Sequence, residues 1–363
     1  MLLPPIFIHT SDRMAFKTCR RAWFWASPLG LSLRPQRTSP SYWFGTGIHE
    51  ALAAYYSNGT TPANNFAYYI SAYGKELFSN SELSIEQEEQ LHAFLLLGQG
   101  MLAHYVSYMN ETGADTKYTA LGTEIKFVVP ILEGVYYAGK IDALFLDEKT
   151  GVIWIVEHKT TSQMREDDFY VFDEQCGSYI WALHQICKGR GFIDLDKEAL
   201  RHKSFGGILY NELRKKVPAE PRILVSGQLS EAKNQDTTHT TYKNYLIRNG
   251  YNLDAYKDIL AYLKTKPNTF FRRTFVRRND TEIKALGHQI QIEASDMLQC
   301  SIPEHEYVRY PNPGYQAMNC LRCAFVGPCI ATNDGIKDYA FSSLDYKSVK
   351  IDGEEWLRER IRG

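Results

Sequence analysis

The chain has 363 residues, of which 44% are hydrophobic and 23% are charged, and its formal net charge is −1. This composition is typical of a globular protein with a large core, and the balanced charge excludes a surface that is basic overall, so nucleic acid can be bound only in a local basic groove. The sequence has no apolar run long enough for a membrane helix, and an odd number of cysteines, seven, argues against a disulfide framework. We therefore expect a cytoplasmic protein that does not contact membranes.

Apolar residues at spacings of three and four predict that the first third of the chain is helical. The segment Gly45-Thr46-Gly47 is predicted to break this pattern and to precede a new helix. The expected helices are residues 11–25, 48–56, 65–78 and 85–109.

The pattern then changes to that of strands and turns. β-branched and aromatic residues over 123–130, 135–146 and 152–158 predict a three-stranded antiparallel meander. Further along we expect a helix over 168–188, strands over 205–213 and 222–226, a polar surface loop over 226–243, and helices over 242–264, 280–297 and 353–361. This order predicts the α/β class, with a mixed central sheet flanked by helices.

Two carboxylates and a lysine occupy the second predicted hairpin. If its turn centres between Lys149 and Thr150, Asp142 faces Glu157 across the ladder, with Cβ atoms roughly 4.5–5.5 Å apart. Lys159 shares the face of Glu157, because the two are separated by one residue on the same strand. Facing carboxylates repel one another unless they are neutralised, and a shared divalent cation would neutralise them. The alternative is a plain charge cluster on a surface hairpin, against which the apolar residues leading into Glu157 argue.

These segments resemble the RecB-type branch of the PD-(D/E)XK nucleases. Four pieces of that branch appear in order along the chain. Gly45-Thr46-Gly47-Ile48-His49-Glu50 is similar to its first motif, Asp142 to its second, Glu157-His158-Lys159 to its third, and Gln175 with Tyr179 to its Q-x-x-x-Y element, while Glu124 resembles an acidic residue often found on its first strand.

The resemblance implies a restriction-endonuclease-like core and a metal site. His49, Asp142, Glu157 and the backbone carbonyl of His158 are expected to hold Mg²⁺ or Mn²⁺, and Lys159 to assist the attack of water on phosphorus. Gln175 and Tyr179 are expected to pack beside this site and to contact DNA. An ordinary structural histidine and an ordinary helix face are the alternatives when each piece is taken alone.

Three cysteines, Cys320, Cys323 and Cys329, are spaced C-x2-C-x5-C and need a fourth ligand. Cys19 is the expected fourth, because the residues around it resemble the N-terminal cysteine motif of nucleases that carry an iron–sulfur cluster, among them AddB-type, CRISPR-associated and phage exonucleases. The resemblance implies a four-iron four-sulfur cluster that joins the two ends of the nuclease core. Four thiolates also suit a tetrahedral zinc ion, and the spacing alone does not choose. The other cysteines, Cys176, Cys187 and Cys300, are predicted to be buried thiols.

Basic residues lie beside aromatic ones at several points, a grouping that suits a channel for single strands. A solvated charged face is the alternative. The clusters are Arg20-Arg21 with Trp23 and Trp25, Arg214-Lys215-Lys216, and Phe270-Phe271-Arg272-Arg273 with Arg277-Arg278.

We therefore expect a metal-dependent DNA exonuclease that acts on DNA ends or single strands in recombination, repair or phage DNA metabolism, with a helicase, recombinase or single-strand-binding protein as partner. The alternative is a catalytically inactive DNA-binding or assembly subunit with the same fold. The expected organisation is an N-terminal helical region over 1–110, a catalytic core over 111–190, a DNA-contacting extension over 191–310, and an iron–sulfur clasp with the tail over 311–363.

Overall fold

A mixed seven-stranded sheet forms the centre of the molecule. The structure is a computed structural model, and it describes residues 5–35, 40–74, 84–164, 166–200, 203–321, 323–333 and 346–348. The strand order is β6-β3-β4-β5-β7-β8, with β1 paired to β4, and a small second sheet joins β2 to β9. The strands are β1 (Ile6–Ile8), β2 (Leu33–Pro35), β3 (Tyr118–Leu132), β4 (Val135–Asp147), β5 (Val152–Thr161), β6 (Phe192–Ile193), β7 (Ser204–Arg214), β8 (Phe271–Val276) and β9 (Tyr346–Ser348).

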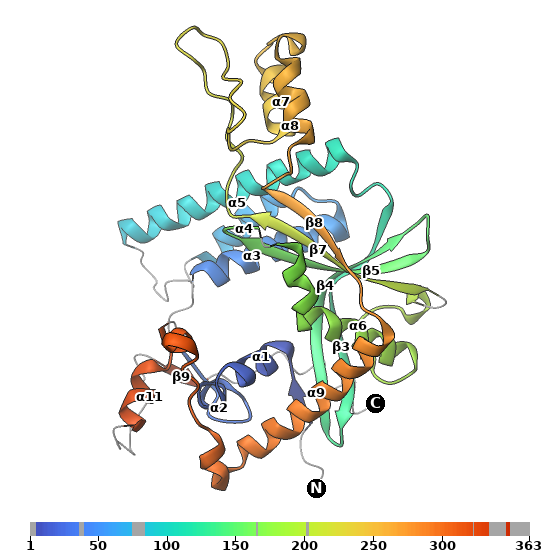
Figure 1. Ribbon diagram of the computed structural model, residues 1–363, viewed down its shortest axis with the longest axis vertical. Helices are drawn as coiled ribbons and strands as arrows, with labels where there is room; N and C mark the ends of the chain where they lie inside the picture. Colours follow the sequence, from blue (N-terminus) through green and yellow to red (C-terminus); the bar gives the residue numbers. More distant parts are fainter. Residues whose placement is uncertain are drawn as a thin grey trace.

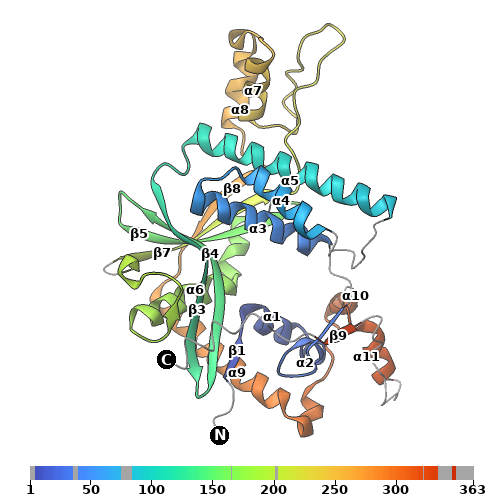
Figure 2. The ribbon, with the colours of Figure 1, turned by 180° about the vertical axis from the view of Figure 1, so that it is seen from behind.

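Helices cover both faces of this sheet (Figures 1 and 2). One core packs α6, α9 and α1 on one face, and a second core packs α3, α4 and α5 beside the other. The helices are α1 (Thr10–Thr18), α2 (Arg20–Ala26), α3 (Pro40–Asn58), α4 (Pro62–Tyr73), α5 (Ile85–Thr112), α6 (Glu174–Cys187), α7 (His239–Arg248), α8 (Lys257–Thr265), α9 (Asp280–Ser301), α10 (Met318–Leu321) and α11 (Val326–Asn333). Short 3₁₀ helices are η2 (Asp167–Phe172), η3 (Lys197–Leu200), η4 (Leu253–Tyr256), η5 (Pro303–Val308) and η6 (Tyr315–Ala317).

The predicted meander is confirmed, because β3, β4 and β5 pair in sequence as antiparallel neighbours. Side chains along a strand alternate between the two faces. On β5, Ile153 and Ile155 join the core under α6, whereas Trp154 and Val156 face the other side. Because β5 is buried on both faces, packing fixes its position in the sheet, including the position of the residues at its carboxyl end. The α/β class predicted from the order of elements is also confirmed.

Helix α3 corrects one prediction, since it runs through Gly45-Thr46-Gly47 instead of beginning after it. A Cβ atom on Gly47 would lie 2.7–2.9 Å from ring atoms of Tyr69 and Phe66 on α4. Glycine here therefore allows close packing of two helices and does not break the helix.

Replacing Gly47 by Ala should lower the free energy of unfolding by about 1–3 kcal/mol, because the added methyl group forces α3 and α4 apart. Gly45→Ala is the matched control, since its new Cβ would meet only the Thr160 hydroxyl, at 3.4 Å. Urea unfolding of both variants measures the difference. Equal effects of the two substitutions would contradict the packing explanation.

Other boundaries differ for local reasons. The helix predicted over 11–25 is interrupted at Cys19, whose backbone is extended. The helix predicted over 242–264 is interrupted after Arg248, and Gly250, two residues further on, has a φ of 71°. The strand predicted over 222–226 forms a single bridge, Ile223 to Leu229, and the polar loop ends where α7 begins. The helix predicted over 353–361 lies outside the described residues.

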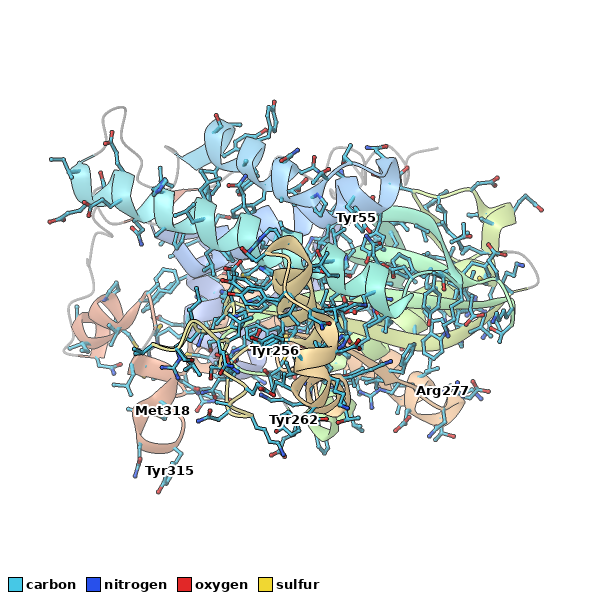
Figure 3. All side chains as sticks on the ribbon, turned by 90° about the horizontal axis from the view of Figure 1, so that it is seen from above. Tyr55, Tyr256, Tyr262, Arg277, Tyr315 and Met318 are labelled. Carbon is cyan, nitrogen blue, oxygen red and sulfur yellow. The ribbon has the colours of Figure 1, made fainter. Side chains whose placement is uncertain are left out.

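An insertion between β7 and β8, which we call the arm (residues 218–265), extends away from the sheet. It contains α7 and α8 and has its own small core, which includes Tyr242, Leu246 and Tyr256. Figure 1 shows the arm above α5, and Figure 3 looks down on it, with Tyr256 and Tyr262 over the middle of the molecule. Among the described residues, no helix is long and apolar enough to cross a membrane.

Candidate active site

The β4–β5 hairpin brings the two predicted carboxylates together. Its ladder pairs Ala143 with Val156, which is the register predicted from the sequence. Asp142 and Glu157 hold the next facing positions beyond that pair. Because facing residues direct their side chains to the same side of a sheet, the two carboxylates lie on one face.

Asp142 is buried and is held by groups from two other segments. Its Oδ2 accepts a hydrogen bond from the backbone N–H of His158 at 2.7 Å, and its Oδ1 lies 3.3 Å from Nδ1 of His49 on α3. Burial by itself would raise the pKa of Asp142, but the interactions with the two histidines outweigh it and lower this pKa to about 2. Asp142 is therefore ionised at neutral pH, with His49 beside it.

Glu157 and Lys159 form a second group with the start of α6. Glu157 Oε1 accepts hydrogen bonds from Lys159 Nζ at 2.6 Å and from Gln175 Nε2 at 3.0 Å. Gln175 also accepts from Lys159 at 3.2 Å and donates to the hydroxyl of Tyr179 at 3.2 Å. The glutamine and tyrosine predicted to share a helix face thus lie beside the carboxylate and the ammonium.

Glu157 has an unusually high affinity for a proton. Burial, followed by the charge of Asp142, raises its pKa to about 7, and Lys159 offsets only part of this rise. The cost of two close, buried negative charges is therefore relieved by a proton when no cation is present. A divalent cation would displace that proton, because metal ligands have to be deprotonated.

Glu124 belongs to the same site on the other side of Asp142. It lies between the β3–β4 pairs Thr123–Ala143 and Ile125–Ile141, opposite Asp142. One ligand atom from each of His49, Glu124 and Asp142 lies within 4.8 Å of the others. Three neighbouring strands thus each carry a carboxylate at facing positions, with Glu124 on β3, Asp142 on the middle strand β4 and Glu157 on β5.

The backbone of Glu124 is in the left-handed region, with a φ of 52°. Such a conformation costs about 1–3 kcal/mol for a residue with a side chain, and it persists where the surrounding structure imposes it. The sequence prediction mentioned Glu124 but left it out of the metal ligands. The pairing rule used for the second hairpin would have missed it by one residue, since a turn at Glu133-Gly134 pairs Leu132 with Val135 and so predicts Ile125 opposite Asp142. The register shift between Pro130 and Leu132 brings Glu124 to that position instead.

A cleft of about 500 Å³ opens onto this site. His49, Glu124 and Asp142 line it together with three lysines, Lys140, Lys159 and Lys215. Carboxylate oxygens and an imidazole nitrogen are suitable ligands for Mg²⁺ or Mn²⁺, so the residues present fit such a cation. The lysines supply ammonium groups that can contact a phosphate group in the cleft.

The side chain of His158 lies on the other face of the sheet. Its Nδ1 is 3.0 Å from Nδ2 of Asn211, its ring stacks on Tyr56 with centroids 5.9 Å apart, and burial lowers its pKa to about 3. The ring is therefore neutral and held by structural contacts. Its backbone remains the group that the sequence prediction assigns to the cation.

The basic clusters predicted to stack on bases are corrected in part. Trp23, Trp25, Phe270 and Phe271 are buried in the cores and present no surface to a base. Arg272 binds Glu212, Arg273 binds Asp115, and Arg214 and Lys216 both pair with Asp236. Of the Arg214-Lys215-Lys216 cluster, Lys215 lines the cleft.

Four cysteines from the two ends of the chain line a separate cavity of about 260 Å³, namely Cys19, Cys320, Cys323 and Cys329. Three of their sulfurs accept N–H groups at 3.4 Å, from the backbone of Asn312 to Cys19, from Phe325 to Cys323 and from Arg21 to Cys329. Burial, with a smaller contribution from the other three thiols, raises the pKa of Cys323.

The other three cysteines lie elsewhere. Cys176 and Cys300 are buried as predicted, whereas Cys187 is exposed, which corrects that prediction.

A mixed sheet that presents acidic residues and a lysine beside one cleft defines a metal-dependent nuclease with a restriction-endonuclease-like fold. The family profile of the PD-(D/E)XK nuclease superfamily matches residues 11–329, and the chain therefore belongs to this superfamily. No curated protein matches the chain. The matched region reaches from α1 to the last of the four cysteines.

The high pKa of Glu157 predicts a pH dependence of stability. Between the ordinary value of 4.5 and about 7, the folded chain keeps a proton that the unfolded chain has released, so this group lowers the free energy of unfolding as pH rises through that range. Glu157→Gln removes this contribution. The stability of the variant relative to the native chain should therefore increase by on the order of 1–3 kcal/mol from pH 5 to pH 8 without divalent ions.

Urea unfolding of both proteins at several pH values measures this difference. The comparison is needed because buried His158, with its lowered pKa, contributes a slope of the opposite sign to both proteins. Parallel stability profiles for the two proteins would show that Glu157 is ionised throughout.

Proposed function

We propose that the protein is a DNA exonuclease of the RecB-type branch, acting on DNA ends or single strands with Mg²⁺ or Mn²⁺. The observation that supports this proposal most is the placement of Asp142 between Glu124 and Glu157, with Lys159 bound to Glu157. A divalent cation bound there polarises the phosphoryl oxygen and activates water. Recombination, repair or phage DNA metabolism would be the setting, with a helicase, recombinase or single-strand-binding protein as partner.

The ligand set that we propose is His49, Asp142, Glu157 and the backbone carbonyl of His158. Because Glu124 lies with His49 and Asp142 on the other side, Asp142 can serve two neighbouring cations. Lys159 is held in a fixed direction by two acceptors, and it stabilises the negative charge that develops on the phosphate. Gln175 keeps both Glu157 and Lys159 in place.

We also propose that the four cysteines hold a four-iron four-sulfur cluster. Thiolates around a zinc ion lie about 3.8 Å apart, as follows from a zinc–sulfur bond of about 2.3 Å in a tetrahedron. Among the described residues, no three of these cysteines have sulfurs all within 4.8 Å of one another. The wider spacing, the cavity between the sulfurs and the N–H groups that point at them favour a larger group.

In this proposal, residues 1–110 and 311–363 each supply part of the cluster site, and residues 1–110 also supply His49. Residues 111–190 form the catalytic core, and residues 191–310 contact DNA.

Iron and zinc analysis of protein purified without oxygen, together with its colour, tests the identity of the group that the four cysteines bind. Zinc in a colourless and active protein would contradict the iron–sulfur assignment and leave the nuclease assignment intact.

Cleavage of end-labelled DNA tests the nuclease assignment. Linear single and double strands labelled at either end, and a circular single strand, are incubated with Mg²⁺, with Mn²⁺ or with a chelator. We expect metal-dependent release of short products from the linear strands and an intact circle. Cutting of the circle would contradict the exonuclease assignment, and binding without cleavage would favour an inactive DNA-binding subunit.

A further inference from the structure

Helix α1 lies between the four cysteines and the proposed active site. The residue that follows the helix is Cys19, and Asn312 fixes this junction with hydrogen bonds to the carbonyl of Thr18 at 2.9 Å and to the Cys19 sulfur at 3.4 Å. The body of α1 packs against α6 and α9. One short helix therefore ends at the cysteine cavity and packs against the helix that carries Gln175.

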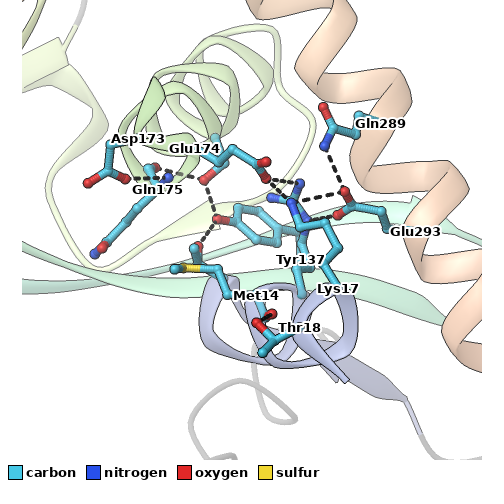
Figure 4. Close-up of polar contacts among 12 residues, drawn as sticks. Met14, Lys17, Thr18, Tyr137, Asp173, Glu174, Gln175, Gln289 and Glu293 are labelled. Carbon is cyan, nitrogen blue, oxygen red and sulfur yellow. Dashed lines mark hydrogen bonds and ion pairs between the residues drawn. The ribbon is translucent and has the colours of Figure 1, made fainter. Parts of the chain in front are cut away.

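Arg13 connects α1 to Glu174, the first residue of α6. Figure 4 shows Lys17, Glu174 and Glu293 at this junction of three helices. The guanidinium of Arg13 is buried and donates to Glu293 of α9 at 2.5 Å and to Glu174 of α6 at 3.3 Å. Lys17, one turn further along α1, pairs with the same two carboxylates. Two cations and two carboxylates thus join three helices at one point.

A second chain of hydrogen bonds runs parallel to this one. Thr10 of α1 contacts the hydroxyl of Tyr137 at 2.6 Å, and that hydroxyl contacts Ser178 at 2.6 Å. Ser178 in turn donates to the backbone carbonyl of Gln175 at 2.7 Å. Both connections from α1 therefore end at Gln175 or at its neighbour Glu174.

A small movement of the first turn of α6 would displace side chains of the proposed active site. Gln175 bridges Glu157 and Lys159 with bonds of 3.0 and 3.2 Å, and its backbone N–H is capped by Asp173 at 2.9 Å. A displacement of about 1 Å at a catalytic group can reduce the rate by about a hundredfold. A buried arginine with two carboxylates adds little net stability, but it fixes the relative position of the elements that it joins.

We propose that Arg13 is a positioning residue for the active site, acting through Glu174 to fix the first turn of α6 and thereby to hold Gln175 against Glu157 and Lys159. This inference rests on the proposed nuclease function. Arg13 does not touch the cleft, and its effect on the rate comes through the position of α6.

The two acceptors of Arg13 provide a matched pair of variants. Glu174→Gln and Glu293→Gln each remove one carboxylate from the same two cations, and only Glu174 precedes Gln175. We expect Glu174→Gln to lower kcat about tenfold with little change in melting temperature or in DNA affinity. Glu293→Gln, at the more buried acceptor, should lower the melting temperature more and change kcat less than about threefold.

A double-mutant cycle then separates positioning from general destabilisation. In a Gln175→Ala background, Glu174→Gln should cause no further loss of kcat, because the residue that it positions is gone. The proposal is overturned if the loss of kcat in the two variants follows the loss of melting temperature, or if the Glu174→Gln penalty persists without Gln175.

Hydrogen exchange provides a measurement that does not depend on cleavage. Faster exchange of the amides of residues 174–178 in Glu174→Gln, and not in Glu293→Gln, supports the positioning role, and equal rates in both variants overturn it. A native protein that cuts no DNA would refute the proposed function separately from these results.

Discussion

Replacing Lys159 by Ala is expected to reduce the rate of DNA cleavage by about 10³-fold while leaving the fold intact. Burial by itself would lower the pKa of Lys159, but the charge and hydrogen bond of Glu157 outweigh it and raise this pKa, so the side chain is an ammonium at neutral pH. Its Nζ lies 2.6 Å from Glu157 and 3.2 Å from Gln175, both fixed by buried elements. An ammonium held in this way stabilises charge on a phosphate without reorganising, and alanine cannot replace it.

Lys140→Ala is the matched control for this prediction. Lys140 lines the same cleft and pairs with Glu124, so its loss removes one positive charge from the opposite side of the cleft. We expect it to reduce cleavage by at most about tenfold, through weaker attraction of the phosphate. Single-turnover rates of both variants, with circular dichroism as the test of folding, decide the question. An active Lys159→Ala protein, or equal losses in both, would remove Lys159 from the mechanism.

The register of the active-site hairpin could be predicted from the sequence because it depends on local information. A short turn and alternating side chains fix which residues face each other, and a shift by one would turn every apolar residue of β5 to the wrong face. The same logic holds for Gln175 and Tyr179, whose spacing places them on one side of α6. The proximity of Asp142 to Glu157 therefore followed from the hairpin alone.

The position of His49 beside Asp142 depends on packing that no local pattern encodes. The glycines before His49 looked like a break in a helix, yet Gly47 is required by the rings of α4, which lie at another point in the sequence. Propensity is a weak guide where tertiary packing sets the residue type. The resemblance to known nucleases identified His49, whereas the pattern around it suggested the wrong start of the helix.

Strand β8 was missed for a related reason. Phe270-Phe271-Arg272-Arg273 resembles a surface for nucleic acid, because arginines usually lie in water. Here the arginines are paired with Glu212 on the neighbouring strand and with Asp115 after α5, so the segment can form a buried strand. Partners so distant in sequence cannot be recognised from the arginines themselves.

On the proposed iron–sulfur assignment, replacing Cys323 by Ser should remove the iron and lower the free energy of unfolding by about 3–5 kcal/mol, because the cluster would close a loop of roughly 300 residues between Cys19 and Cys320. Serine is a poor ligand for iron in a site built of thiolates. Cys187→Ser is the control, since Cys187 is exposed and remote from the cavity. Absorbance in the visible range, iron content and urea unfolding measure the effects.

Loss of the proposed cluster should also reduce cleavage by more than the loss of stability explains. Cys19 follows α1 directly, and α1 is joined to α6 by Arg13 and, by way of Tyr137, by Thr10. A released Cys19 should therefore loosen the helix that positions Gln175. At a temperature where Cys323→Ser is still fully folded, its kcat should therefore already be lower than that of the Cys187→Ser control. A variant that lacks iron, remains folded and cuts DNA at the native rate would show that the two sites are independent, because loss of the cluster would then leave the position of α6 unchanged.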